Sequence, residues 1–404
     1  MIRRLQLLVL AVIVAVAAFS TGWLFLFFLV YIALLVGGGS YILTRLGLSD
    51  LEAGYAVSQL SGHVGDRLRV TYTLRNTGRV PKPWLEVHNP STLPGGLPGR
   101  ALSLGGRAER SWLVRTPLVH RGHFRIEPLQ IRTGDPFGFF EASAGVGQGI
   151  TLVVYPKIDA LPLWRLPPAN IEGAHASPER TLQTTPLATT VRPYAPGDSM
   201  NRIHWRSTAK TGEIQVKEFD LEQTADAWIF LDLDAAVEAG TGDDTTTEVM
   251  VRAAASIADK ALAENRAVGL TVSAHRLTVL PADRGARQRL KILQLLAAVE
   301  ADGRTPLDEA LVTGVSRLRR GMTAIVITAS QDPSFVRPLA ALKTRGIGTV
   351  VVAADLPAFE PPTDERTAEA HRQHARALKH TLAEYQLRTF LVDPVRPLAE
   401  ALAR

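Results

Sequence analysis

Residues 192–219 bring cations, carboxylates, a His and a Trp together in an order that no helix or strand periodicity explains. The acidic side chains of this segment alternate with five basic ones, which are Arg192, Arg202, Arg206, Lys210 and Lys217. Opposite charges at this density can neutralise one another. The first interpretation is therefore an ion-pair network that joins two domains.

Two other interpretations give the same segment a chemical role. Guanidinium groups bind carboxylates and phosphates through two parallel hydrogen bonds, so Arg202 and Arg206 could hold an anionic ligand or a partner's acidic segment. Asp198, His204 and Ser207 are the residue types of a hydrolytic triad. The triad is the weakest of the three interpretations, because no nucleophile elbow or oxyanion loop accompanies Ser207.

The local pattern predicts how these side chains are presented. Residues 196–197 are Pro-Gly, which favours a type II turn, and Asp198 follows in position to cap a short helix. That helix would place Arg202 and Arg206 one turn apart on a common face. Residues 213–219 alternate as a strand.

A second group of polar residues follows an apolar run at the start of the C-terminal part, residues 227–404. Apolar strands alternate there with helices, which predicts a doubly wound α/β domain with a parallel sheet. Ligands bind such sheets beyond the carboxyl ends of the strands, at the topological switch point. The rule directs attention to Asp232 and Asp234, which end the first strand.

The Asp232 loop resembles the loop that carries the metal-ion-dependent adhesion site of von Willebrand factor A domains. Magnesium needs hard oxygen donors in octahedral array, and that site draws them from three loops. Here Asp234 and Ala236 replace the hydroxyl residues of the first loop, Thr305 represents the second, and an Asp is missing from the third. Asp232 and Asp234 are therefore expected mainly to bind backbone amides. A weak Mg²⁺ held by Asp232, Asp234 and Thr305 is the alternative, and no other cofactor is expected.

An antiparallel β-sandwich of the immunoglobulin or fibronectin sort is predicted for residues 50–158. Short period-two runs punctuated by Gly and Pro fill this region, with no amphipathic helix between them. Trp84 and Trp112 stand within such runs and are expected to be core anchors. Residues 135–138, Asp-Pro-Phe-Gly, predict a tight turn that closes a hairpin.

The N-terminal residues predict a membrane anchor over residues 1–46. Residues 5–36 carry no charge, and as one helix they would be about 48 Å long, too long for a hydrocarbon core of about 30 Å. Two spans folded back at residues 20–22 fit better than one long anchor or a cleaved signal. Arg3, Arg4 and Arg45 would then lie in the cytoplasm. This predicts a multi-pass inner-membrane protein with cytoplasmic soluble domains.

Composition sets limits on the partners. The chain has 404 residues with a net charge of +6 that is spread along its length, which argues against a dedicated nucleic-acid-binding protein. It contains no Cys, so disulfides and thiolate chemistry are excluded. The length suggests several domains, and residues 159–226 are expected to link the sandwich to the α/β domain.

The linking segment resembles the signature of the domain-of-unknown-function 58 family. The match runs through residues 192–194, 197–198, 202–206, 209–210, 212 and 216–219, and residues 121–122 and 135–138 are similar to that family's pattern at the end of the sandwich. Residues of the segment that would bind a partner or an anion, or join domains, are Arg192, Tyr194, Asp198, Arg202, His204, Trp205, Arg206, Lys210 and Lys217.

The resemblance implies a membrane-anchored, non-enzymatic adaptor. Members of the family are thought to act with MoxR-type AAA+ ATPases in assembling or maturing client proteins. The alternative from the residues is a membrane-bound hydrolase or phosphate-binding protein that uses Asp198, Arg202, His204 and Arg206.

Overall fold

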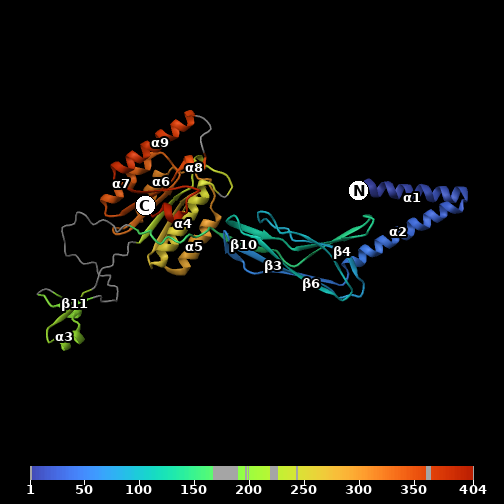
Figure 1. Ribbon diagram of the computed structural model, residues 1–404, viewed down its shortest axis with the longest axis horizontal. Helices are drawn as coiled ribbons and strands as arrows, with labels where there is room; N and C mark the ends of the chain where they lie inside the picture. The colour runs from blue at the N-terminus through green and yellow to red at the C-terminus, as the bar shows by residue number, and fades with distance from the viewer. Residues whose placement is uncertain are drawn as a thin grey trace. The chain divides into compact units, whose positions relative to one another are not determined.

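A computed structural model of the chain describes residues 2–166, 190–195, 198, 200–218, 226–242, 244–360 and 365–403 (Figure 1). It divides into two compact units. The first contains Met1–Lys157 with Leu293–Ala298, and the second contains Ile158–Ile292 with Val299–Arg404.

Two helices open the first unit, α1 (Ile2–Thr21) and α2 (Leu24–Leu48). They pack against each other and are joined at Gly22, whose φ of 66° permits the predicted reversal. In the described part of the chain, α2 alone is long and apolar enough to cross a membrane, since the apolar part of α1 is limited to Val9–Thr21. That part would be about 20 Å long, short of a hydrocarbon core of about 30 Å. The prediction of a membrane span is thus supported for one helix, and two spans are not supported.

Ten strands in three sheets follow these helices in the first unit and are called here the β-rich unit. One sheet contains β1 (Leu51–Val57), β3 (Arg67–Asn76) and β6 (Glu109–Pro117). A second contains β2 (Ser61–His63), β10 (Ile150–Tyr155) and β7 (Gly122–Ile126). The third contains β5 (Arg100–Leu104), β4 (Lys82–His88), β8 (Leu129–Gly134) and β9 (Glu141–Val146). Neighbouring strands in these sheets are antiparallel, except that β2 pairs parallel with β10. Several β-sheets are confirmed, and the immunoglobulin-like topology stays a prediction.

Buried and exposed side chains alternate along β3, so every second residue from Leu68 onward contributes to the core of the β-rich unit. Trp112 packs against this core by stacking on Tyr72, with ring centroids 5.2 Å apart. The core prediction is wrong for Trp84, which is 41% exposed. An irregularity in the pairing of β4 between Lys82 and Leu85 turns those two side chains inward and leaves Trp84 outside.

The second unit contains a six-stranded sheet in the order β15-β14-β13-β16-β17-β18. These strands are β15 (Leu277–Asp283), β14 (Val268–Ser273), β13 (Ala227–Asp232), β16 (Thr323–Thr328), β17 (Gly348–Ala354) and β18 (Arg388–Val392). All neighbours are parallel except β14 and β15. Every residue of β13, β14, β16 and β17 is buried, as expected for a parallel sheet. The predicted α/β arrangement is confirmed at this level.

Helices flank this sheet (Figure 1). They are α4 (Thr246–Ala263), α5 (Gly285–Ala298), α6 (Leu307–Val315), α7 (Val336–Thr344), α8 (Leu356–Phe359), α9 (Glu365–Glu384) and α10 (Leu398–Ala401), with 3-10 turns η2 (Ala235–Val237) and η3 (Pro333–Phe335). Sequence reasoning missed β15 and α9. The edge strand β15 contains Pro281 and has no fully buried residue, and α9 is largely polar and buries only a narrow stripe that includes Leu378 and Leu382.

Candidate functional site

The described residues of 190–218 form a small structure of their own, called here the signature substructure. Strand β11 (Thr190–Pro193) pairs antiparallel with β12 (Gln215–Glu218), and η1 (Met200–Arg202) and α3 (Trp205–Thr211) lie between them in sequence. Ile203 and Val216 are buried and form a bridge. The predicted strand at 213–219 is confirmed over β12. The predicted turn at 196–197 and Phe219 lie outside the described residues.

Asp198 binds Arg192 instead of capping a helix. Its two carboxylate oxygens accept hydrogen bonds from Nη2 and Nη1 of Arg192, each at 2.8 Å, and one also accepts from the Ala195 amide at 2.9 Å. The ion pair therefore closes within the segment, so that the carboxylate fixes the β11 end of the substructure. The prediction that Asp198 caps the helix that carries Arg206 is wrong, because this helix, α3, begins seven residues later at Trp205.

His204 caps α3 in place of Asp198. Its Nδ1 accepts a hydrogen bond from the Ser207 amide at 3.3 Å and lies 2.7 Å from Ser207 Oγ. These are the contacts of a helix N-terminus, and both Asp198 oxygens are already engaged by Arg192. The geometry therefore gives the triad interpretation no support.

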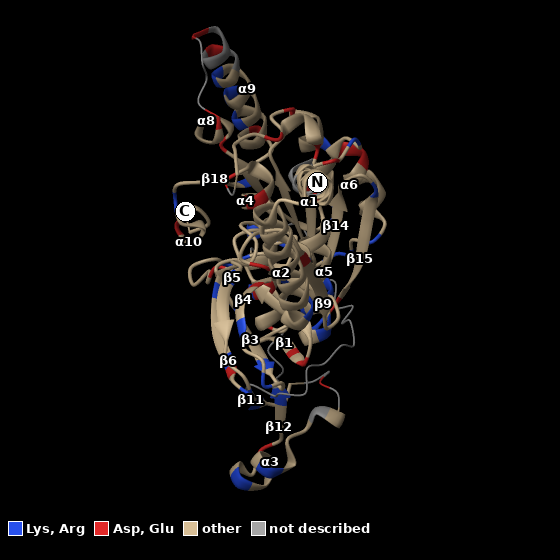
Figure 2. Cartoon of the chain, turned by 90° about the vertical axis from the view of Figure 1, so that its right-hand side faces the viewer, with Lys and Arg blue, Asp and Glu red and all other residues tan. Residues whose placement is uncertain are grey.

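The predicted common face of Arg202 and Arg206 is also wrong, because Arg202 ends η1 whereas Arg206 lies in α3. The side chain of Arg202 is outside the described part. Trp205, Arg206, Lys210 and Tyr194 are exposed and Lys217 is half-buried. In Figure 2 the blue parts of the α3 ribbon mark its basic residues. The substructure thus offers cations and aromatic rings to solvent, and binding there stays a prediction.

A second candidate site lies at the carboxyl end of β13. If the six strands are numbered from β13 as strand 1 to β18 as strand 6, their order in the sheet is 3-2-1-4-5-6. The chain therefore passes from β13 to β14 and β15 on one side, and then continues with β16 on the other side of β13. The switch point therefore lies between β13 and β16. The last residues of these strands, Asp232 and Thr328, meet there, and the Thr328 hydroxyl donates a hydrogen bond of 2.7 Å to Asp232 Oδ2.

The Asp232 carboxylate is buried and only half satisfied. Its side chain is 1% exposed, and Oδ1 has no hydrogen-bond partner among the described residues. Burial raises the pKa of Asp232 from its ordinary value of 3.8 to about 6, and the nearby charge of Asp234 also raises it. The Thr328 hydroxyl and, to a smaller extent, the Asp234 backbone amide favour the ionised form and lower this pKa. Such a carboxylate can take a proton near neutral pH or accept a hydrogen bond or cation from a ligand.

The structure brings the other two predicted site residues to the same edge. Asp234 caps η2 by accepting from the Ala236 amide at 3.0 Å, and it forms a bridge with Gly303. The segment that follows includes Thr305, whose carbonyl accepts from Ser273 Oγ at 3.1 Å. Asp232, Asp234, Thr305 and Thr328 are called here the switch-point site.

Sequence reasoning did not select Thr328 for this site, because it looked for an Asp just after that strand. The available signal was position: Thr328 is the last residue of the strand that follows the switch.

The donor set fits a tightly held metal poorly. Asp232 and Thr328 present hard oxygens, but Asp234 is used as a cap and the described residues contain no group of three His, Cys, Asp or Glu side chains that could hold a metal ion. Most ligands of a Mg²⁺ ion would have to come from water or a partner. Backbone capping, the favoured interpretation, accounts for Asp234 and leaves Asp232 Oδ1 unexplained.

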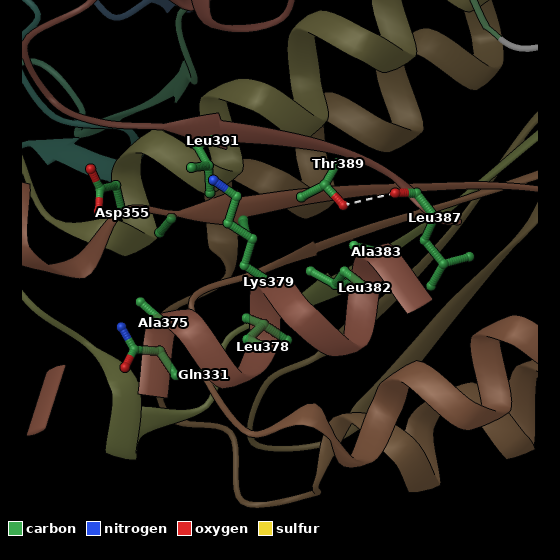
Figure 3. A pocket seen from close by; sticks show the side chains of 12 residues that line it. Gln331, Asp355, Ala375, Leu378, Lys379, Leu382, Ala383, Leu387, Thr389 and Leu391 are labelled. Carbon is green, nitrogen blue, oxygen red and sulfur yellow. Dashed lines mark hydrogen bonds between the residues drawn. The ribbon is translucent and has the colours of Figure 1, made fainter. Parts of the chain in front are cut away.

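A separate pocket of about 370 Å³ lies between α9 and strands β17 and β18 (Figure 3). Its lining is mostly aliphatic, with Lys379, Asp355 and Gln331 among the polar side chains. The Thr389 hydroxyl in it donates to the Leu387 carbonyl. The pocket is therefore suited to an apolar group and is distinct from the switch-point site.

Comparisons with known proteins find a family match and several uncharacterised relatives. Residues 190–358 match the family model "Protein of unknown function DUF58". The uncharacterized protein YeaD of Bacillus subtilis (strain 168) is 26% identical over 310 residues, 74% of each chain. The uncharacterized protein Rv1480 of Mycobacterium tuberculosis (strain ATCC 25618 / H37Rv) is 28% identical over 159 residues, 38% of this chain and 50% of that protein.

Among solved structures, the CARDB domain of a Pyrococcus furiosus protein is similar to part of the chain. It is 16% identical, covers 26% of this chain and 92% of that one, and has a TM-score of 0.20. A score of this size carries no argument about fold or function.

The family match begins at β11 and ends within α8. It therefore includes both the signature substructure and the switch-point site, and this part of the chain matches the DUF58 family of proteins of unknown function.

Proposed function

We propose that this protein is a membrane-anchored adaptor that binds a partner protein at the switch-point site. The observation that carries the proposal is the buried Asp232 carboxylate, whose Oδ1 has no hydrogen-bond partner in the described structure. An unsatisfied buried oxygen costs free energy, and a ligand that donates to it recovers that cost. The Asp232 carboxylate lies at the edge of the sheet where open α/β folds bind ligands.

A binding role accounts for the site better than catalysis does. Asp232 is paired with the Thr328 hydroxyl, which also accepts from the Ser330 amide at 2.9 Å, so this hydroxyl serves to orient the loop. A partner's Lys or Arg, or a Mg²⁺ ion that the partner's carboxylate helps to hold, has the charge that an ionised Asp232 favours. The strand order and the antiparallel β15 support the comparison with von Willebrand factor A domains, and on this proposal the second unit is such a domain.

The partner that we propose is a MoxR-type AAA+ ATPase. The support is the family match, because the resemblance of the signature residues implies such a partner. In this arrangement α2 fixes the protein in the inner membrane, and the soluble units face the cytoplasm. The second unit then presents the ATPase to client proteins that are assembled or matured.

Capture of the partner tests the proposal. The full chain, solubilised from membranes with detergent, is used as bait with a nucleotide analogue that traps AAA+ ATPases, and captured proteins are identified by mass spectrometry. We expect an AAA+ ATPase with the wild type and at least tenfold less with Asp232→Asn. Val312→Ala, a change of an exposed side chain on α6, is the control and should capture as much as the wild type.

Two results would contradict the proposal. One is the absence of any AAA+ ATPase from the wild-type capture. The other is equal capture by the wild type and by Asp232→Asn, which would place the contact elsewhere.

A further inference from the structure

The C-terminal third of α2 is packed onto the β-rich unit (Figure 1). Ser40 and Thr44 on this part of the helix are buried. A Cβ added at Gly47 would lie 2.6 Å from Thr133 Cγ2 in β8, so only glycine allows this approach. The buried Lys82 of β4 donates to the carbonyl of Leu46, near the helix end where a cation is favoured. The end of α2 is therefore attached to β4 and β8.

The turn between β8 and β9, Asp135 to Phe140, lies beside this part of α2 and is called here the aromatic turn. Phe140 packs edge-to-face on Tyr41 of α2, with ring centroids 5.6 Å apart. Phe137 is 62% exposed and stacks on Phe139 at 5.7 Å. The Asp135 carboxylate points inward and accepts from the Phe137 and Phe140 amides at 2.8 and 2.6 Å. The turn thus exposes an apolar ring while its charge is hidden.

The length of α2 sets the level of this turn relative to a bilayer. Trp23 precedes the helix, and Tyr41 follows 18 residues later, which corresponds to about 27 Å of helix against a hydrocarbon core of about 30 Å. Trp and Tyr are enriched at the two membrane interfaces. Arg45 lies one turn beyond and its Nε donates to the Tyr41 hydroxyl at 3.3 Å, a position suited to the headgroups. Tyr41, and with it the aromatic turn, therefore falls at an interface.

We propose that the aromatic turn enters the lipid bilayer at its interface, with Phe137 and Phe139 at the boundary between headgroups and acyl chains. The partner surface is the lipid itself. The inference rests on the membrane anchoring by α2 that belongs to the proposed function. It adds a second membrane contact, which would fix the orientation of the β-rich unit relative to the bilayer.

Depth-dependent fluorescence quenching tests the proposal. The natural chain has no Cys, so a single introduced Cys carries the only label. The full chain with Phe137→Cys is labelled with an environment-sensitive fluorophore and reconstituted into vesicles of phosphatidylcholine and phosphatidylglycerol that contain lipids with a nitroxide near the headgroup. The matched control is Leu60→Cys, which is 60% exposed in the loop between β1 and β2. Phe28→Cys, 63% exposed within α2, reports on the anchor itself.

We expect the label at position 137 to be quenched at least twofold more than the label at position 60. Equal quenching at 137 and 60, with strong quenching at 28 by lipids labelled deep in the acyl chain, would overturn the proposal and leave the anchor intact. A label at 28 that no lipid quencher reaches would overturn the proposed anchoring as well.

Discussion

The buried carboxylate of Asp232 makes the stability of the second unit depend on pH. Its pKa in the folded state is about 6 against an ordinary value of 3.8, and burial is the main cause. The folded protein therefore binds the proton more tightly than the unfolded chain does. Protonation stabilises the fold, and this contribution is complete below about pH 4 and is lost as pH rises through 6.

The size of the effect follows from the shift. A difference of about 2.2 pKa units corresponds to about 3 kcal/mol of unfolding free energy over the whole titration. About 1.4 kcal/mol of it falls between pH 5 and pH 7.5, because the unfolded carboxyl has already lost most of its proton at pH 5. That change is tenfold in the equilibrium between the folded form, in which the β13 amides are protected, and the unfolded form, in which they exchange.

Hydrogen exchange of the β13 amides, measured by mass spectrometry on the full chain in detergent, reports this equilibrium. After correction for the intrinsic exchange rate, we expect protection of the wild type to be about tenfold greater at pH 5 than at pH 7.5. Asp232→Asn has no carboxyl group that can titrate and should lose this difference, with protection at pH 7.5 higher than in the wild type.

The matched control is Asp234→Asn, which changes a neighbouring carboxylate while Asp232 remains. It should keep most of the pH dependence. The reasoning would be refuted if wild-type protection were the same at both pH values, or if Asp232→Asn kept the tenfold difference.

Two further substitutions test the packing around the switch-point site. Thr328→Val removes the hydroxyl that favours the ionised Asp232, so the unfolding free energy should fall by about 2 kcal/mol at pH 7.5 and by much less at pH 5. Hydrogen exchange of the β13 amides measures both values, and an equal loss of protection at the two pH values would contradict this. Gly314→Ala adds a Cβ that meets the buried ring of Phe230, which should cost about 1–3 kcal/mol in denaturant unfolding, whereas Val312→Ala on the same helix should cost under about 0.5. An unchanged midpoint for Gly314→Ala would show that the helix moves away freely.

Local patterns predicted much of the second unit because its strands are buried on both faces. A run such as Ala227–Asp232 is apolar throughout, and the helices between such runs show helical periodicity. The edge strand β15 was missed because it is only partly buried and is interrupted by Pro281, and helix α9 was missed because it is largely polar. Trp84 was misassigned because a pairing irregularity, invisible in the alternation of its own strand, turns it outward.

The signature segment shows the limit of reading side chains along a chain. Its residue types allowed an ion-pair network, anion binding or, least of the three, a triad. The pairing of Arg192 with Asp198 and the capping of α3 by His204 followed only from the fold of β11 against β12.

The sequence by itself determined the order of an apolar N-terminus, β-rich strands and α/β units, together with the family signature and Asp232 as a candidate site residue. These depend on composition and on periods of two and 3.6, which are local. The tertiary structure alone decided that Thr328, 96 residues further on, contacts Asp232, and that the aromatic turn lies against Tyr41. Such contacts depend on strand order and helix docking, which no local pattern encodes.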